Sequence, residues 1–321
     1  MIENLTEKYG VGALLYSPAL NGKVADAVIH GKFGKPYSLA LCLEDTVAED
    51  SVEAAERQLA ETVRRIRTAA EESSFYLPKL FIRVRSCEQM LRLSRILLPD
   101  RAVVSGYIFP KYTLSNADAY NGAVAALNRE AEKPVWMMPI LESPDIVDYG
   151  TRRAVLTELK EKIDSVKPYV LNIRVGGNDF SNEFSVRRRC DETIYDILPI
   201  AQLFGDILTV FSREYVVSGP VWEYFSGENG EWEAGLRREL KLDRLNGFVG
   251  KTVIHPKQIA VVNDALKVSG ADYADAMEIL NWDRGGLLVG KSSAGERMNE
   301  VRTHLNWARK TAALAEIYGV R

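Results

Sequence analysis

SLALCLEDTVAEDSVEAAERQLAETVRRIRTAA, residues 38–70, is the stretch of sequence from which the fold is best predicted. Residues 38–43 form a short apolar run, as in a strand that is buried on both faces. From Ser51 onward, apolar side chains recur at steps of three and four residues: Val52, Ala55, Leu59, Val63 and Ile66. Ser51 is a suitable N-cap, and charged residues cover the other face. The stretch therefore predicts a buried strand followed by an amphipathic helix.

The same pattern of strand and helix repeats along the chain. Further short apolar runs occupy residues 12–17, 79–84, 103–109, 134–140, 169–175, 215–219 and 251–254. Eight such repeats favour a parallel barrel over a doubly wound sheet. We therefore predict an α/β fold with a (β/α)8 TIM barrel over residues 1–265. Residues 266–321 are predicted to form a C-terminal helical extension, in which a glycine-rich turn at 283–300 is either a mobile lid or a plain loop.

The composition is that of a soluble globular protein. The 321 residues are 46% apolar and 26% charged, with a net charge of −3. Lys and Arg are scattered, so no basic stripe points to nucleic acid. No run approaches the roughly 20 apolar residues of a membrane span, and the N-terminus lacks a secretory signal, so we expect a cytoplasmic protein with no membrane partner. Cys42, Cys87 and Cys190 lie far apart and show no zinc-site spacing.

Polar side chains follow the predicted strands at the point where each strand ends. In a parallel barrel these ends meet at one face, where the chemistry gathers. The residues concerned are Ser17, Glu44, Asp45, Arg83, Arg85, Lys111, Glu142, Ser143, Asn178, Asp179, Ser218 and His255. We therefore expect a functional site at this face.

Several of these residues allow an ordinary structural interpretation. Glu44 and Asp45 can cap the helix that begins near Ser51, and Lys111 can be a solvated loop lysine. Asp179 follows two glycines, as in an ordinary turn.

Glu142 and Arg83 favour a functional interpretation. Glu142 ends the apolar run MMPILE, where an unpaired carboxylate would cost several kcal/mol, so we expect a metal ion or an arginine beside it. Arg83 lies in the apolar run FIRVR, whose outer face a helix would cover, so its side chain is expected inside or at the rim.

Together these residues suggest one kind of chemistry. Two carboxylates without histidine or cysteine fit Mg²⁺, which leaves positions for water and substrate oxygens. An arginine beside such an ion can hold a substrate carboxylate with two hydrogen bonds. An ion chelated by a carbonyl and a carboxylate would stabilise an enolate. No G-x-S-x-G motif is present, so retro-aldol or Claisen-type chemistry is favoured over hydrolysis by a serine.

Eight short segments occur in an order that resembles a known family. They are LLYSPA, LCLEDTVA, FIRVR, FPK, ILESP, GGNDF, VSGPV and GFVGKTVIHPKQI, which together span residues 14–263. The order is similar to that of the citrate lyase β-subunit-like branch of the HpcH/HpaI aldolase superfamily. NIRVGGNDFSN, RRRCDETIYDI and GERMNEVRTHLNWA resemble more closely the C–C bond lyase-like subgroup that is encoded near tellurium-resistance genes.

The resemblance implies a (β/α)8 barrel in which Glu142 and Asp179 hold Mg²⁺. It implies that Arg83 binds the carboxylate of an oxoacid and that Glu44 and Asp45 order water at the metal. The neighbouring strand-end residues are then expected to contact substrate: Arg85, Lys111, Ser143, Gly177 and Asn178. Gly176 and Gly177 would let backbone and substrate approach the ion. Relatives commonly form oligomers in which the C-terminal segment covers a neighbour's barrel, so we expect a homo-oligomer.

The chain also departs from the family pattern. The arginine ahead of the first strand's turn is absent, with Gly12 near that place, and the motif GFDGK reads GFVGK, so Val249 replaces an acid. These departures argue against a CoA or acyl-carrier thioester as substrate. In the aldolase branch a histidine follows the glutamate of the second strand, where this chain has Asp45, so no general base is carried over.

The expected function is therefore that of a Mg²⁺-dependent carbon–carbon lyase acting on a small oxoacid or its hydroxy-acyl adduct. One alternative on the same fold is phosphoryl or phosphonate chemistry on a substrate like phosphoenolpyruvate. Another is a barrel that binds a metabolite or partner without turnover. Arg174 either lines the pocket or pairs with a neighbouring acid.

Overall fold

The computed structural model describes residues 2–283 and 285–321, which divide into two compact units. The larger unit is Val11–Val262, and the smaller one combines the chain up to Gly10 with Asn263–Arg321.

The larger unit is built around eight parallel strands. They are β1 (Ala13–Pro18), β2 (Ser38–Cys42), β3 (Lys79–Arg83), β4 (Val104–Phe109), β5 (Trp136–Leu141), β6 (Ile173–Val175), β7 (Val217–Ser218) and β8 (Lys251–Val253). Their order, β7-β6-β5-β4-β3-β2-β1-β8, places each strand beside its neighbour in sequence and joins β8 to β1. A single bridge between Gly219 and Lys251 links the remaining two edges. The predicted (β/α)8 barrel is confirmed.

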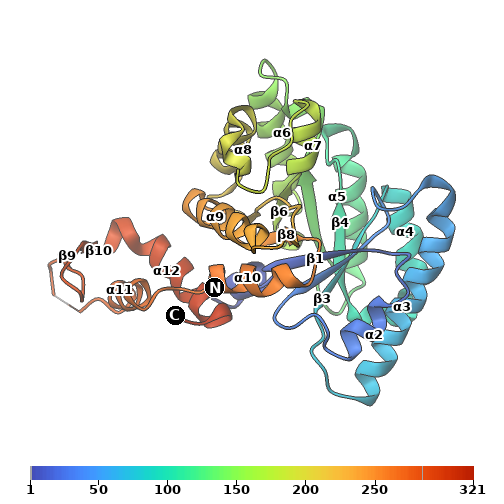
Figure 1. Ribbon diagram of the computed structural model, residues 1–321, viewed down its shortest axis with the longest axis horizontal. Helices are drawn as coiled ribbons and strands as arrows, with labels where there is room; N and C mark the ends of the chain where they lie inside the picture. Colours follow the sequence, from blue (N-terminus) through green and yellow to red (C-terminus); the bar gives the residue numbers. More distant parts are fainter. Residues whose placement is uncertain (1, 284) are drawn as a thin grey trace. The chain divides into compact units, whose positions relative to one another are not determined.

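Helices connect the strands and surround the sheet in Figure 1. They are α2 (Val24–Ile29), α3 (Val52–Glu72), α4 (Cys87–Ile96), α5 (Leu114–Arg129), α6 (Arg152–Asp164), α7 (Gly177–Glu183), α8 (Leu198–Phe211), α9 (Glu231–Asn246) and α10 (Lys257–Leu266). Short 3₁₀ turns occupy Glu49–Ser51, Leu98–Val103, Pro144–Ile146, Lys167–Tyr169 and Ile194–Asp196. On α3 the stripe of Ala55, Leu59, Val63 and Ile66 is fully buried, as the spacing predicts.

Apolar side chains from successive strands fill the barrel interior. The cluster comprises Val11, Leu14, Ala40, Phe81, Ile108, Met138, Ile140 and Leu171, all of them buried. Gly106 on β4 permits close approach to β5, because a Cβ there would lie 2.0 Å from the carbonyl oxygen of Trp136. The interior is therefore a packed core, and any ligand must bind at an end of the barrel.

A buried ionic cluster supports the seam between β7 and β8. The ammonium of Lys251 lies 2.9 Å from Glu239 and 2.7 Å from Asp243, both on α9, and all three side chains are buried. Arg188 also pairs with Glu239, at 3.0 Å. The lysine of the GFVGK motif thus ties α9 to the last strand.

The smaller unit contains three helices and a hairpin. They are α1 (Ile2–Tyr9), α11 (Gly270–Leu280), α12 (Val301–Tyr318) and the antiparallel strands β9 (Val289–Lys291) and β10 (Met298–Glu300). The predicted glycine-rich turn is therefore largely a hairpin, although Arg284 lies outside the described residues. Ala276, Ile279 and Ala308 form its core, and the Tyr318 hydroxyl donates a hydrogen bond to the Tyr9 carbonyl at 2.8 Å.

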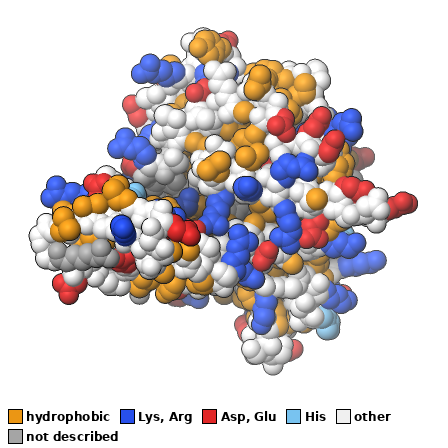
Figure 2. All heavy atoms as spheres, turned by 60° about the vertical axis from the view of Figure 1, so that its left-hand side comes forward, with side chains coloured by type: hydrophobic (Ala, Val, Ile, Leu, Met, Phe, Trp, Pro, Cys, Tyr) orange, Lys and Arg blue, Asp and Glu red, His pale blue; other side chains and the backbone are white. Residues whose placement is uncertain are grey.

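Two surface properties bear on the predictions. Acidic, basic and apolar side chains occur together over the face seen in Figure 2. None of the helices that the structure describes is at once long and apolar enough to span a bilayer.

Candidate active site

A cavity of about 210 Å³ lies at the C-terminal ends of the barrel strands. It is lined by Tyr16, Asp45, Thr46, Arg83, Ile140, Glu142, Arg174, Val175, Gly176, Gly177, Asn178, Asp179, Val221, Thr252 and Ile254. Six residues of the predicted site are therefore brought together: Asp45, Arg83, Glu142, Gly177, Asn178 and Asp179.

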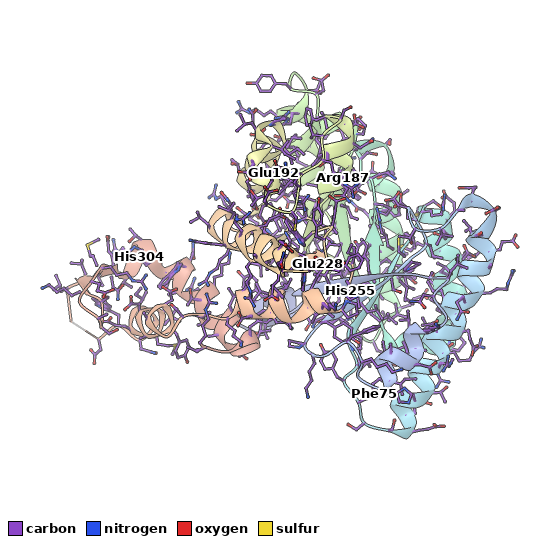
Figure 3. All side chains as sticks on the ribbon, in the orientation of Figure 1. Phe75, Arg187, Glu192, Glu228, His255 and His304 are labelled. Atoms are coloured by element: carbon purple, nitrogen blue, oxygen red, sulfur yellow. The ribbon has the colours of Figure 1, made fainter. Side chains whose placement is uncertain are left out.

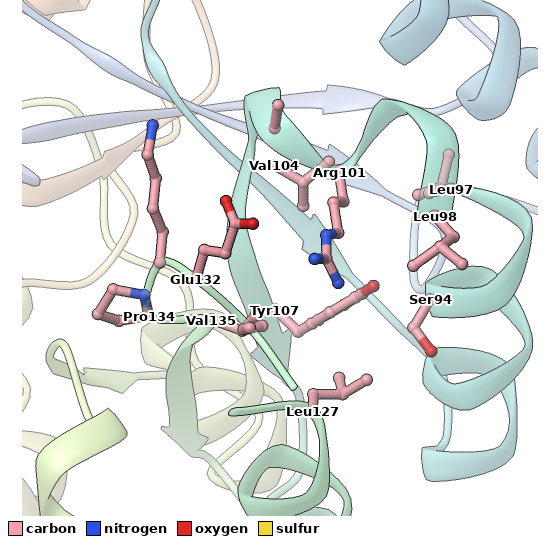
Figure 4. Close-up of a pocket in the computed structure, with 13 residues that line it drawn as sticks. Ser94, Leu97, Leu98, Arg101, Val104, Tyr107, Leu127, Glu132, Pro134 and Val135 are labelled. Carbon is pink, nitrogen blue, oxygen red and sulfur yellow. The ribbon is translucent and has the colours of Figure 1, made fainter. Parts of the chain in front are cut away.

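A second cavity, of about 240 Å³, lies at the opposite ends of β4 and β5 (Figure 4). Its wall is largely apolar, with Leu97, Leu127 and Tyr107, and exposed Arg101 and Glu132 stand at its rim. It contains none of the predicted site residues. Because TIM-barrel sites form at the C-terminal ends of the strands, the cavity that contains Glu142 is the candidate site.

Glu142 is a buried carboxylate that its surroundings only partly neutralise. It follows β5 and is 4% exposed. Its Oε1 accepts a hydrogen bond from the Lys111 amide at 2.9 Å and lies 3.5 Å from Arg83 Nη2. Burial raises the pKa of this carboxyl to about 8, the charge of Arg83 opposes the shift, and the charge of Asp179 adds to it. The predicted cation partner is thus present as an arginine, at the long end of ion-pair distance.

Glu142 and Asp179 both lie beside Gly176. A Cβ on Gly176 would stand 2.3 Å from Glu142 Oε2 and 3.1 Å from Asp179 Oδ2. Asp179 belongs to the first turn of α7, which corrects its interpretation as a turn residue. The missing side chain of Gly176 leaves the two carboxylates facing a common space.

The second glycine has a different role from the one expected. A Cβ on Gly177 would lie 2.7 Å from the side chains of both Ile194 and Pro220. Gly177 lines the cavity, but its small size is required for packing on the side away from it.

Two acidic and two basic side chains form an ionic network beside these carboxylates. Arg83 Nη2 lies 2.6 Å from Glu44 Oε2 and 3.0 Å from Asp45 Oδ2. Lys111 Nζ lies 2.5 Å from Glu44 Oε1 and 3.2 Å from Asp45 Oδ1. Glu44 and Asp45 are therefore bound into the site and do not cap α3.

The network shifts the pKa values of Glu44 and Asp45 in opposite directions. Burial, together with the side-chain hydrogen bond that the Glu44 carboxyl donates to Asp45, raises the pKa of Glu44. Desolvation would also raise the pKa of Asp45, but the hydrogen bond with Glu44 and the charges of Arg83 and Lys111 outweigh it and lower that pKa. Desolvation alone would lower the pKa of Arg83. Tyr16 and the surrounding carboxylates have the larger effect, so the pKa of Arg83 is raised overall. The ionised form of Asp45 is thus favoured at the cavity wall.

The backbone of Lys111 has an uncommon conformation that serves the site. Its φ is 48°, in the left-handed region that non-glycine residues seldom adopt. Its amide points to Glu142, its side chain reaches Glu44 and Asp45, and its carbonyl accepts a hydrogen bond from Asn116 Nδ2 at 2.9 Å. One strained residue thus connects the two acidic groups of the site.

Arg85 and Ser143 lie outside the cavity lining. The Arg85 guanidinium donates to the carbonyls of Leu43 and Val47 and pairs with Glu49 at 2.5 Å, so it braces the loop after β2. Ser143 is buried, and its hydroxyl has no hydrogen-bond partner among the described residues. Arg85 is thus placed on the loop after β2 and not at the cavity wall.

Sequence reasoning left out Tyr16 and Thr252 and did not assign Arg174. All three line the cavity. Arg174 Nη2 donates to Thr252 Oγ1 at 2.7 Å, and the Arg83 guanidinium stands over the Tyr16 ring at 5.7 Å. The available signal was an arginine in the middle of an apolar barrel strand. His255 (Figure 3) instead stacks on Phe225, and burial lowers its pKa.

The donor set at Gly176 fits Mg²⁺. Mg²⁺ takes one or two carboxylates and completes its octahedron with water and substrate oxygens. Among the described residues, no group of three or more His, Cys, Asp or Glu side chains is arranged to hold a metal ion. A partly neutralised Glu142 and an adjacent Asp179 supply the two oxygens that such an ion requires.

A comparison with protein families gives a match over almost the whole chain. A family model described as C-C_Bond_Lyase of the TIM-Barrel fold matches residues 5–320. Over 130 residues the chain is 27% identical to the (3S)-malyl-CoA thioesterase of Cereibacter sphaeroides, a match that covers 40% of this chain and 42% of that enzyme. The matching segment thus spans less than half the length of that relative.

Solved structures share the fold at low sequence identity. One is CitE from Mycobacterium tuberculosis in complex with magnesium, acetoacetate and coenzyme A, with 19% identity, a TM-score of 0.62 and coverage of 96% of this chain and 99% of that one. The citrate lyase β subunit of the same organism, complexed with oxaloacetate and magnesium, has 19% identity, a TM-score of 0.54 and coverage of 81% and 98%. RipC from Yersinia pestis has 16% identity, a TM-score of 0.54 and coverage of 83% and 99%.

Proposed function

The chain belongs to the C–C bond lyase family of the TIM-barrel fold, and from that premise we propose that it is a Mg²⁺-dependent carbon–carbon lyase acting on a small oxoacid or its hydroxy-acyl adduct. The observation that carries the proposal is that Glu142 and Asp179 both approach the position that a side chain on Gly176 would occupy, in one cavity. The pKa of Glu142 is near 8, which means that its ionised form is disfavoured beside a second carboxylate. A cation bound between the two groups would stabilise that form.

Each residue of the site has a role in this proposal. Glu142 and Asp179 would hold the ion, which when bound supplies a Lewis acid that polarises a substrate carbonyl. Arg83 orients the substrate carboxylate, since its guanidinium is buried and lines the cavity. Asp45 stays ionised and accepts hydrogen bonds from water at the cavity wall, while Lys111 and Glu44 hold it in place.

The known relatives support this substrate class. Fold neighbours have been solved with magnesium and acetoacetate or oxaloacetate. The similarity to a malyl-CoA thioesterase favours a second candidate, the same chemistry on a CoA thioester. Gly12 and Val249 are the departures that argue for a free acid.

Calorimetric titration tests the proposal. Mg²⁺, and then oxaloacetate, pyruvate or glyoxylate, is titrated into the wild type, Glu142→Gln and the exposed control Glu130→Gln. We expect Mg²⁺ to bind the wild type and the control, and oxoacids to bind only after Mg²⁺. Glu142→Gln should weaken Mg²⁺ binding at least about tenfold. Equal binding by all three proteins would remove the metal assignment, and a preference for acyl-CoA adducts would select the second candidate.

Two further expectations from the sequence remain proposals of their own. One is a homo-oligomer in which residues 266–321 contact a neighbouring subunit, which sedimentation of the full chain and of a chain lacking those residues would test. The other is a cytoplasmic location, which fractionation would test.

A further inference from the structure

Arg174 is a buried cation whose charge no acid of the described chain balances. It lies in the centre of β6, is 1% exposed and lines the candidate cavity. Its Nη2 donates to the Thr252 hydroxyl at 2.7 Å, whereas Nε and Nη1 have no hydrogen-bond acceptor among the described residues. Burial lowers the pKa of Arg174, the neighbouring Tyr16 hydroxyl opposes this, and the charge of Arg83 adds to it.

The other buried basic side chains of the barrel unit differ in this respect. Each of them has a carboxylate within 3 Å: Arg83 with Glu44 at 2.6 Å, Arg152 with Asp206 at 2.9 Å, Arg188 with Glu239 at 3.0 Å, and Lys251 with Asp243 at 2.7 Å. A buried charge without a partner is strongly unfavourable, so it marks a position kept for a ligand more often than one kept for stability. Arg174 is therefore the buried cation of the barrel unit whose counter-ion would have to come from outside the chain.

Strand register places Arg174 at the floor of the cavity. It pairs with Ile140 of β5, a member of the interior core, and lies two residues before Gly176. Arg174 and its hydrogen-bond partner Thr252 line the same cavity as Gly176 and the two carboxylates beside it. Arg83 reaches the cavity from β3, on another part of the wall.

We propose that Arg174 binds a second anionic group of the substrate, so that the site selects an oxoacid with two anionic ends over a monocarboxylate. This inference rests on the proposed function, because Arg83 is assigned the first carboxylate there. The second group is either a carboxylate or a phosphate-type oxyanion, since a guanidinium recognises both through the same hydrogen bonds. The remaining nitrogens, Nε and Nη1, are the donors that would meet it.

The test compares ligands that differ in one anionic group. Oxaloacetate, pyruvate, phosphonopyruvate and the plain diacid malonate are titrated with and without Mg²⁺ into the wild type, Arg174→Met and Arg174→Lys. We expect Arg174→Met to weaken oxaloacetate binding roughly 10- to 100-fold and pyruvate binding by less than about threefold. Arg174→Lys should retain part of the preference. If phosphonopyruvate binds more tightly than oxaloacetate and shows the larger loss, the second group is a phosphate-type oxyanion.

Thermal unfolding separates this role from a structural one. Arg174→Met should leave the melting temperature unchanged or raise it, because it removes an unbalanced buried charge. The matched control Arg152→Met removes a buried guanidinium that pairs with the half-buried Asp206 and donates to the carbonyls of Ile146 and Val147, so it should lower the melting temperature without altering the preference between ligands.

The possible outcomes distinguish the two proposals. Equal losses for oxaloacetate and pyruvate in Arg174→Met, or no diacid binding by the wild type, would overturn the inference. Diacid binding that needs Arg174 but ignores Mg²⁺ would uphold the inference and remove the metal-dependent function.

Discussion

Replacing Glu142 by glutamine tests the metal site through a measurement of the free energy of unfolding, without an assay of enzyme turnover. Burial raises the pKa of Glu142 from an ordinary value of 4.5 to about 8 in the metal-free protein. The folded state therefore keeps a proton that the unfolded state loses, so stability falls as the pH rises between those two values. One pKa unit corresponds to about 1.4 kcal/mol, so the total loss from this carboxyl is at most about 5 kcal/mol.

Mg²⁺ should act in the opposite direction. It binds the ionised carboxylate, so its stabilising effect should grow with pH, reaching about 2.7 kcal/mol at a concentration 100 times the Kd. Glutamine has no proton to lose, so Glu142→Gln should lack both the fall in stability and the Mg²⁺ effect.

Urea unfolding measured at one-unit steps from about pH 5 to about pH 9 checks this prediction. The difference between wild type and variant removes the contribution of every other titrating group. Glu130→Gln, at an exposed position, controls for the change of charge. Parallel curves for the wild type and Glu142→Gln, with equal responses to Mg²⁺, would refute the reasoning.

Further predictions follow from three other positions. Lys251→Met should lower the free energy of unfolding by about 3–5 kcal/mol in urea titrations, because it leaves the buried Asp243 without a cation and Glu239 with Arg188 alone; a change below about 1 kcal/mol would show that the cluster is not buried in solution. Gly176→Ala should weaken Mg²⁺ binding about 10- to 100-fold in calorimetry, because the new Cβ would stand 2.3 Å from Glu142 Oε2. Gly122→Ala, where a Cβ meets no atom within 4 Å, should leave binding unchanged. Arg85→Gln should change oxoacid affinity by less than about threefold, since its partners are loop carbonyls and an exposed glutamate; a loss comparable to that of an Arg83 variant would return Arg85 to the binding site.

Much of the barrel could be predicted from the sequence because its signals are local. Each of the eight apolar runs overlaps a strand, and the stripe from Ala55 to Ile66 is the buried face of α3. The residues after the strands converge because parallel strands end at one face. For that reason Arg83, Glu142 and Asp179 could be placed in one site without a structure.

What the sequence did not reveal depends on contacts between distant segments. Arg83 and Arg85 stand two residues apart, yet one lines the cavity and the other braces a loop. Asp179 lies on a helix of seven residues that begins with a glycine, where helix propensity is weak and packing against Ile194 and Pro220 contributes. The left-handed backbone of Lys111 has no sequence signature, because lysine does not favour that conformation.

The smaller unit is built from segments at both ends of the chain, and this determines the order in which the two units can fold. Helix α1 packs with α12, and the Tyr9 carbonyl receives its hydrogen bond from Tyr318. The whole barrel, Val11–Val262, is translated between these partners, which at 5–20 residues per second takes roughly 13–50 s. During that interval α1 has already been synthesised, but α12, the helix against which it packs, has not. The barrel, whose strands pair with their immediate successors, is therefore expected to be folded before the two ends of the chain meet.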